Sequence, residues 1–540
     1  MVKCSLSNRL PSFFLGTYLA VAALTLSSSL LFAQTPLESL GPRQVNFETG
    51  QTLPARTLML KAGTHQTIGS GSGTGSQLYY WGLDYAVTDD FQLGFSSQVI
   101  EDTLEKPILN LRPPTRFYDF GVNAKYRFVN TPRLQVAAQV SLEMLQFRTA
   151  TFGTDRSNAD NLIGSFHTPL TYRIAPRLQL HLTPGVSIFP DQLNGIAYYG
   201  TVASLGTGVT WAASERFQVF TQLNAPLSGG NTINSNREIT KELVYTAGAR
   251  YAFTPKVALE AYVTNGVGVT PASSILTFYP NGDEPLWGLR VLYTPGKNLN
   301  STYRPTPLAV TTPRMMQLQQ DGFTVGTAGI LEPGTLRLLS SVGTSGNFAI
   351  GGAIALDRDF QVEGIIEDYS NDGSITTSDD PTPNSARWMG GGRIRVMDQN
   401  NGNPFSLSLR VLGGRDTVER DYGVLYVAAP ASYDIDNQLT FQAEPKFLAF
   451  GSNRIGGLGL GANFEFLDGL QLMGEVTPIS DGRPLVWAVG ARYYLDGAGM
   501  SVDFSATNSI GRYGLGTMIA QNDTRFSIGL TKSFNLRKFW

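Results

Sequence analysis

The chain has 540 residues, of which 16% are charged and 11% are aromatic, and its formal net charge is −2 at pH 7. Soluble proteins usually carry about 25% charged residues. The balanced charge does not indicate nucleic-acid binding, which relies on an excess of Lys and Arg against phosphate. The single cysteine, Cys4, precedes the first apolar run, so disulfides and thiol catalysis are not expected in an exported form.

The N-terminal residues 1–33 have the pattern of a secretory signal peptide. Lys3 and Arg9 precede an apolar run over residues 10–32, and a small residue follows at the expected cleavage site. Beyond this segment no stretch of about 18 apolar residues occurs, so we expect no membrane helix. Residues 34–55 are predicted to be a short lead-in to the folded part of the chain.

From about residue 56 onwards the sequence reads as one strand after another. Apolar and polar residues alternate with a period of two in 133–144, 177–183, 257–264 and 405–411, which predicts strands with one apolar and one polar face. Short turns alternate with longer polar loops, which is typical of antiparallel hairpins whose long loops gather at one end. The longer loops are expected near residues 67–76, 101–115, 148–160, 225–240 and 267–284.

The sequence is internally duplicated. Gly-Ala-Arg-Tyr at 248–251 recurs at 490–493, and each copy is followed by a Thr-Asn pair, at 264–265 and at 507–508. Matches of this kind at corresponding positions indicate two copies of one structural unit.

Further matches precede and close the two copies. Thr-Pro-Leu and then Pro-Arg occur at the same spacing in 35–43 and in 306–314, and the segment 288–293 resembles 529–534. Strand spacing predicts roughly 12 strands in each copy. The predicted boundaries are a first repeat over residues 56–294, a linker over 295–332 and a second repeat over 333–540.

The last strand is the most informative element. From Phe526 to the final residue, Trp540, apolar residues such as Ile528 and Leu530 share one face, and small polar residues share the other. A final strand that ends on an aromatic residue resembles that of bacterial outer-membrane β-barrel proteins of the porin type, in which it is the signal read by the assembly machinery. Lys538 departs from the pattern, since that position is usually apolar in the family.

The resemblance implies an all-β fold, an antiparallel transmembrane β-barrel in the cell outer membrane, with membrane lipid and the barrel assembly machinery as partners. Only closure satisfies every backbone group of a sheet in lipid. About 24 strands are expected in total, as two tandem barrels of about 12 strands or as one large barrel. Residues 34–55 would then lie in the periplasm, and aromatic pairs such as Phe117-Tyr118 and Tyr198-Tyr199 would form interfacial girdles.

Ionisable residues on the polar faces of the strands are the candidate functional residues. Charge is costly against lipid and tolerated in a wet lumen, so we expect these side chains to point inward. They would either filter solutes in an open pore or pair with one another and fill a narrow barrel. The predicted lumen-lining residues are Arg387, Arg393, Arg395, Lys125, Arg127, Arg250, Arg492, Glu143, Glu260, Glu475 and Asp503.

The resulting functional hypothesis is a passive, porin-like channel for small hydrophilic solutes, without enzymatic activity and without a cofactor. A tandem-barrel component of exopolysaccharide export and a structural surface protein are the alternatives. His65, His167 and His181 show no spacing typical of a nucleophile–base pair or of a metal site. The Gly-rich run 69–75 lacks the Lys-Ser/Thr of a phosphate-binding loop.

Overall fold

A computed structural model gives the fold of this chain, although some segments fall outside the part that it describes. The predicted signal peptide, the Gly-rich run and the first half of the predicted linker lie outside this part. Within the described ranges, no helix is both long and apolar enough to cross a bilayer. The described residues are 42–67, 77–103, 106–110, 114–149, 160–253, 256–294, 312–369, 385–416, 423–436, 438–450, 453–480, 482–495 and 499–536.

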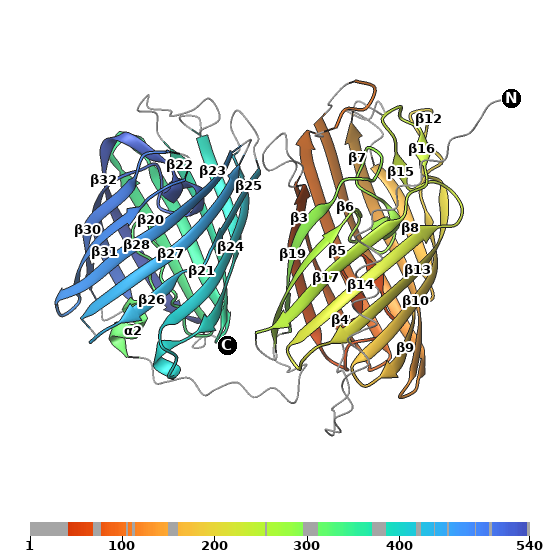
Figure 1. Ribbon diagram of the computed structural model, residues 1–540, viewed down its shortest axis with the longest axis horizontal. Helices are drawn as coiled ribbons and strands as arrows, with labels where there is room; N and C mark the ends of the chain where they lie inside the picture. Colours follow the sequence, from red (N-terminus) through yellow and green to blue (C-terminus); the bar gives the residue numbers. More distant parts are fainter. Residues whose placement is uncertain are drawn as a thin grey trace. The chain divides into compact units, whose positions relative to one another are not determined.

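The first repeat folds into an antiparallel barrel, coloured red to green in Figure 1. Its strands are β3 (Leu58–Thr67), β4 (Gln77–Ala86), β5 (Phe91–Thr103), β6 (Pro114–Asn130), β7 (Leu134–Thr149), β8 (Asp160–His167), β9 (Leu170–Ala175), β10 (Leu178–Ile188), β13 (Thr201–Ala212), β14 (Phe217–Pro226), β17 (Val244–Ala252), β18 (Val257–Thr264) and β19 (Leu286–Tyr293). The barrel closes because β19 pairs with β3. β8 and β9 are two parts of one strand, since both pair with β7 and β10, so the barrel has twelve strands.

The second repeat forms another closed barrel of twelve strands. Its strands are β20 (Thr335–Gly343), β21 (Phe348–Asp357), β22 (Phe360–Tyr369), β23 (Ser385–Met397), β24 (Ser406–Asp416), β25 (Gly423–Ala428), β26 (Ala431–Asp434), β27 (Leu439–Phe450), β28 (Asn453–Leu467), β29 (Leu470–Thr477), β30 (Val486–Tyr494), β31 (Met500–Ser509) and β32 (Ala520–Asn535). Here the last strand, β32, pairs with the first, β20. The sequence allowed one large barrel or two tandem barrels, and the closure of each repeat on itself shows that there are two.

The sixth strand is interrupted at the same place in both barrels. Pro169 separates β8 from β9, and Pro430 separates β25 from β26. Because proline has no N–H, it breaks the ladder of the strand in which it lies. The residue before each proline donates to a proline carbonyl on the next strand, from Thr168 N to Pro184 O at 2.9 Å and from Ala429 N to Pro445 O at 3.0 Å. The duplication therefore extends to a local irregularity.

The side chains of each barrel are apolar outside and charged inside, as β6 illustrates. Val122 is 58% exposed on the outer face, together with Phe120 and Tyr126, whereas Lys125 and Asp119 are fully buried on the inner face. A water-soluble sheet would place these residues the other way round. This polarity is the one that a barrel in lipid requires.

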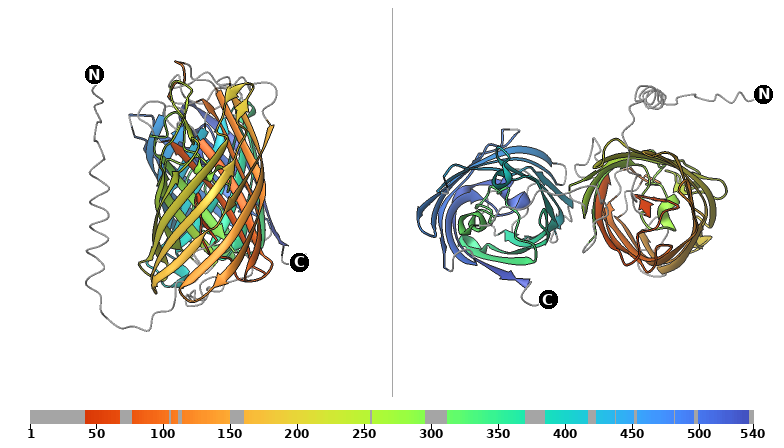
Figure 2. Two further views of the ribbon diagram at one scale, coloured as in Figure 1. Left: turned by 90° about the vertical axis from the view of Figure 1, so that its right-hand side faces the viewer. Right: turned by 90° about the horizontal axis from the view of Figure 1, so that it is seen from below.

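Each lumen is occupied by the chain that precedes its first strand, as the end-on view in Figure 2 shows. In the first barrel this is the luminal hairpin, defined here as residues 42–55, with β1 (Arg43–Gln44) and β2 (Phe47–Glu48). In the second it is the luminal segment, residues 312–332, with α2 (Pro313–Gln317). The described parts of the predicted periplasmic lead-in and linker therefore lie inside the barrels. Their polar groups are stable there because they have partners on the charged inner walls.

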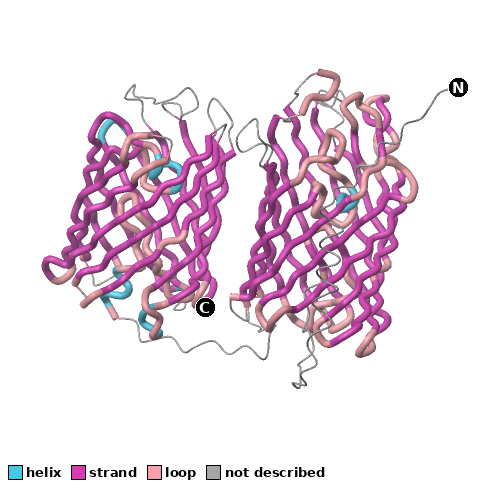
Figure 3. The backbone as a smooth tube through the Cα atoms, in the orientation of Figure 1, coloured by secondary structure: helices cyan, strands magenta, loops and turns pink. Residues whose placement is uncertain are grey.

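A loop also enters each lumen, between the last two strands (Figure 3). Inner loop 1 is residues 265–285, with the short helix η2 (Ser273–Ile275), and inner loop 2 is residues 510–519, with η5 (Gly514–Met518). Both pack in apolar clusters within their barrels. Tyr198 and Tyr199 are buried in the first cluster, so their assignment to an interfacial girdle was wrong.

Because each barrel closes on itself and contains its own luminal chain, we expect one repeat to fold without the other. Residues 34–294, expressed alone and refolded in detergent, should give a heat-modifiable band on electrophoresis. Residues 34–285, which lack β19, should not, since β3 and β18 would keep unpaired edges. Failure of the longer fragment to fold would contradict two independent barrels.

Candidate functional site in the two lumens

The structure places the predicted lumen-lining residues on the inner walls, distributed over both barrels. Arg395 lies toward a barrel end, where it contacts Asp398 and Asp359. The predicted residues do not form a single cluster. The wall charges described below contact the luminal chain or one another rather than an open pore. The buried members are Lys125, Arg127, Glu143, Arg250 and Glu260 in the first barrel and Arg387, Arg393, Glu475, Arg492 and Asp503 in the second.

In the first barrel a cation of the wall holds the luminal hairpin. Lys125 Nζ lies 2.7 Å from Glu48 Oε2 and donates to the carbonyl oxygens of Pro42 and Thr49. Arg43 Nε lies 3.2 Å from the other oxygen of Glu48. The hairpin thus surrounds the ammonium group of Lys125, and all three N–H donors of that group have acceptors in the hairpin.

Polar side chains from around the barrel complete the attachment of the hairpin. Asn46 Oδ1 accepts from Gln222 and from Thr246, on neighbouring strands. On β10, two strands away from Gln222, Thr183 Oγ1 donates to Glu48 O at 2.8 Å. Further wall contacts include Gly50 N to Thr171, Gln51 to Gln179 and Leu53 N to Gln92.

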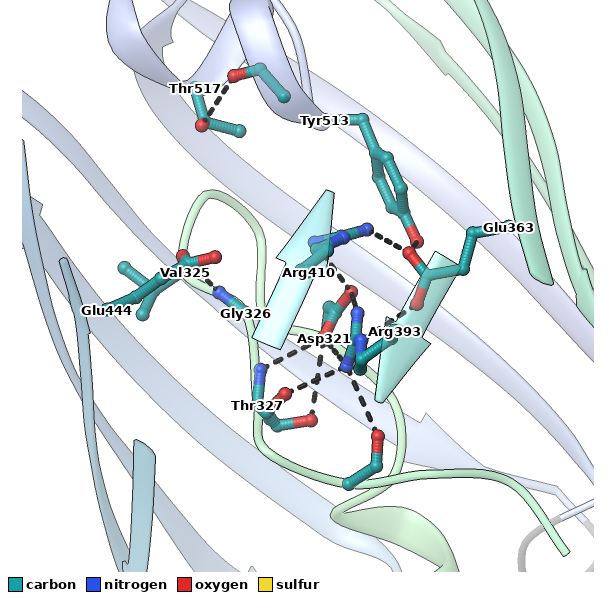
Figure 4. Close-up of polar contacts among 12 residues, drawn as sticks. Asp321, Val325, Gly326, Thr327, Glu363, Arg393, Arg410, Glu444, Tyr513 and Thr517 are labelled. Atoms are coloured by element: carbon teal, nitrogen blue, oxygen red, sulfur yellow. Dashed lines mark hydrogen bonds and ion pairs between the residues drawn. The ribbon is translucent and has the colours of Figure 1, made fainter. Parts of the chain in front are cut away.

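In the second barrel two arginines of the wall bind a carboxylate of the luminal segment (Figure 4). Asp321 accepts from Arg393 Nη1 at 2.9 Å and from Nη2 at 2.6 Å, a bidentate pair. Arg410 lies 3.3 Å from Asp321. Glu363 on the wall joins both arginines, at 2.7 Å from Arg393 and 2.6 Å from Arg410. Burial opposes ionisation of Asp321, but Arg393 and then Arg410 outweigh it and lower its pKa.

Carboxylates of the second wall also bind the main chain of the luminal segment. Glu475 accepts from the backbone N–H groups of three successive residues, Phe323, Thr324 and Val325, at 2.8, 2.5 and 3.0 Å. Glu444 accepts from the next N–H, of Gly326, at 2.7 Å. The second wall thus holds the main chain of its luminal segment with both signs of charge, because Lys446 donates to Thr324 O and Arg393 donates to Thr327 O, while the two carboxylates bind N–H groups.

The Thr-Asn pairs of the repeat turn the two inner loops into the lumens. Asn265 accepts from Tyr245 N at 2.8 Å and donates to Leu243 O at 2.8 Å. Asn508 makes the same contacts with Trp487 N, at 2.8 Å, and with Leu485 O, at 2.7 Å. The preceding threonine donates to the adjacent strand in both barrels, at 2.7 and 2.6 Å. The side chains of the Thr-Asn pair thus make the hydrogen bonds to the adjacent strand at the point where the backbone turns away from the sheet.

Inner loop and luminal chain meet inside each barrel. In the first, Arg43 Nη2 donates to Thr270 O of inner loop 1 at 2.8 Å. In the second, Tyr513 of inner loop 2 donates to Glu363 at 3.2 Å, and the Arg410 guanidinium lies over its ring. Each lumen is consequently closed by chain entering from both ends.

Small cavities remain in the second barrel between residues that the structure describes. Two cavities in the second barrel have volumes of about 100 and about 60 Å³. Sites for small molecules usually measure about 300–1,000 Å³. In this conformation neither cavity is a passage for a hydrated solute.

His181 joins neighbouring strands of the first wall. His181 contacts Thr171 through Nδ1 at 2.9 Å and Thr210 through Nε2 at 3.0 Å, and both threonines also bind the luminal hairpin. Across the described ranges, no group of three or more His, Cys, Asp or Glu residues is arranged to hold a metal ion.

Sequence reasoning missed Glu48 and Asp321, the acidic residues of the luminal chains. They lie in segments interpreted as a lead-in and a linker. The repeated Pro-Arg pattern was the available signal, because Pro42-Arg43 and Pro313-Arg314 open the two luminal chains at corresponding positions.

No protein-family model matches this chain, and no curated protein matches it. Among solved structures it is similar to the KdgM porin, at 10% identity over 44% of this chain and 98% of that chain, with a TM-score of 0.28. For the NanC porin the values are 13%, 44%, 98% and 0.30, and for an outer membrane channel from Pseudomonas putida F1 they are 13%, 45%, 97% and 0.30. At these low scores, the barrel architecture rests on the chain's own strand pairing.

The Asn residues at the start of the inner loops can be tested by hydrogen exchange. Asn265→Ala leaves one N–H and one carbonyl of the neighbouring strand without partners, each costing about 1–3 kcal/mol if it stays buried. We expect faster exchange over residues 265–285, and Asn508→Ala should do the same over 510–519 of the second barrel alone. Asn236→Ala, in an exposed loop, is the control. Unchanged exchange in the inner loops would contradict this role.

Glu48 makes the first barrel sensitive to acid. Burial opposes its ionisation, but Lys125 and then Arg43 outweigh it and lower its pKa from 4.5 to about 2. Stability from the ionised carboxylate is therefore complete above pH 4.5 and is lost as the pH falls through about 2. In urea unfolding of fragment 34–294, we expect a steeper loss over this range for the wild type than for Glu48→Gln. Parallel pH dependences would count against the pairing.

Proposed function

We propose that this chain is an outer-membrane protein whose two barrels are passive channels for small hydrophilic solutes, each closed at rest by its luminal chain. The apolar outer faces and charged inner faces support placement in a bilayer. Strands of 8 to 17 residues, such as β18 and β6, are of the length that a tilted strand needs to cross it. Outer-membrane lipid and the barrel assembly machinery are the proposed partners.

The observation that carries the proposal is how the luminal chains are held. Lys125 in the first barrel and Glu475 in the second bind them through hydrogen bonds that water could replace. Hydrogen bonds to charged groups have a net worth of about 1.5–3 kcal/mol each. A chain attached in this way can leave the wall when water and solute enter, which an apolar plug would resist.

A structural surface protein is the second candidate, because both lumens are closed from both ends. No observation among the described residues favours exopolysaccharide export over these two. Conductance separates the candidates, since a structural barrel has no need to open.

Planar-bilayer recordings test the proposed function. We expect the wild type to be closed with brief openings, and Lys125→Met to raise the open probability of the first barrel about tenfold or more. Its loss leaves Glu48 buried without its nearest cation, and breaking a buried pair costs about 3–5 kcal/mol. Lys125→Met combined with Glu48→Gln should return part of the way to the wild type. Inserted protein that stays silent in all three forms would favour the structural role.

A further inference from the structure

One difference between the two repeats concerns a pair of facing residues on their inner walls. Arg250 faces Glu260 across β17 and β18, and Arg492 faces Asp503 at the corresponding register of β30 and β31. In the first barrel Arg250 Nε lies 2.6 Å from Glu260. In the second, the aspartate is one methylene shorter and its carboxylate lies 3.6 Å from Arg492.

The shorter carboxylate leaves Arg492 incompletely paired. Its side chain is 1% exposed, yet neither Nε nor Nη1 has a hydrogen-bond partner in the part of the chain that the structure describes. Asp503 instead lies 2.8 Å from Arg512 of inner loop 2. Gly529 permits this contact, since a Cβ there would lie 2.5 Å from both Arg512 and Asp503.

Arg492 borders the cavity of about 60 Å³, together with Arg337 and Arg512. Arg337 Nε donates to Ser533 at 3.2 Å, and no ion pair of Arg337 occurs within the described residues. Asp321 also borders the cavity, but its oxygens are taken by the two wall arginines described above. Arg492 and Arg512 therefore share the carboxylate of Asp503, and Arg337 adds a third guanidinium group to the border of the cavity without an ion pair among the described residues. A buried cation without a counter-charge is costly, so the cavity favours an anion.

We propose that this cavity binds the oxyanion group of a small acid, either a carboxylate or a phosphate. Arg492 would donate from Nε and Nη1, with Arg337 and Arg512 supplying further charge-assisted hydrogen bonds. The volume suits one such group, since it corresponds to about four to six water molecules. In the first barrel the longer Glu260 pairs with the corresponding arginine, Arg250, and also with Arg290. A role of this site in solute passage rests on the proposed channel function, whereas anion binding to the closed barrel does not.

Isothermal titration of the full chain in detergent, at fixed ionic strength, tests the site. The probes are inorganic phosphate, a hexuronate as a carboxylate and glucose as a neutral solute. We expect saturable binding of at least one oxyanion and none of glucose. Arg492→Gln should weaken that binding about tenfold or more, because it removes charge-assisted donors.

Asp503→Glu is the more specific test of the site, because it lengthens one side chain without changing any charge. Its longer side chain should reach Arg492, as Glu260 reaches Arg250, and should also weaken binding about tenfold. Arg250→Gln removes the same charge from the other barrel and should leave the affinity within about twofold. Heat-modifiability checks that each variant folds.

Three outcomes would overturn the site: no saturable binding of either oxyanion, equal binding of glucose, or wild-type affinity in a folded Asp503→Glu variant. Phosphate and hexuronate together identify which oxyanion is preferred. Saturable binding by a protein that never conducts would refute the channel and leave the anion site standing. Conductance without binding would do the reverse.

Discussion

The neutralisation of charge inside a closed barrel is the constraint on which the rest of this structure depends. With apolar residues facing outward, charged side chains must turn into a narrow lumen, where the chain itself excludes most of the water. Lys125 and Glu48, or Arg393 and Asp321, are each stable there because the wall and the luminal chain supply opposite charges. Removing one member of such a pair leaves a buried charge, which costs about 3–5 kcal/mol. The charged wall and the luminal chain therefore each neutralise buried charges of the other.

The duplicated unit is a complete barrel together with the chain inside it. The proline break of the sixth strand, the Thr-Asn pair before the inner loop and the Pro-Arg at the start of the luminal chain all occur twice. None of these features would be needed at both places in one large barrel, in which β19 would pair onward rather than return to β3. Repeats at these irregular positions therefore indicate two equivalent units, although they do not show which strands pair.

The sequence predicted what depends on local periodicity. Alternation over residues 133–144 placed Gln139 and Glu143 on the inner face of β7, where they are buried. The choice between one barrel and two depended on hydrogen bonds between strands more than two hundred residues apart in the chain, as between β3 and β19. No local pattern encodes that pairing.

The interior of the lumens was also beyond sequence reasoning. The luminal hairpin forms strands of two residues each, too short for any period to be visible, and the partner of Glu48 lies 77 residues further along the chain. Tyr198 and Tyr199 lie in a loop, where alternation gives no inside or outside. The wall side chains that hold such segments in place come together only after the barrel has closed.

The shared and the divergent contacts of the two repeats differ in kind. Asn265 and Asn508 bind main-chain groups, and main-chain partners are present whatever the neighbouring side chains become. Ion pairs such as Arg250–Glu260 and Arg492–Asp503 join one side chain to another, so a substitution of either residue changes the contacts of its partner. Architecture can therefore stay fixed while the charge pattern of each lumen changes. Glu260 faces Arg290, whereas the shorter Asp503 faces Gly529 and pairs with Arg512, and this change leaves Arg492 open to a ligand.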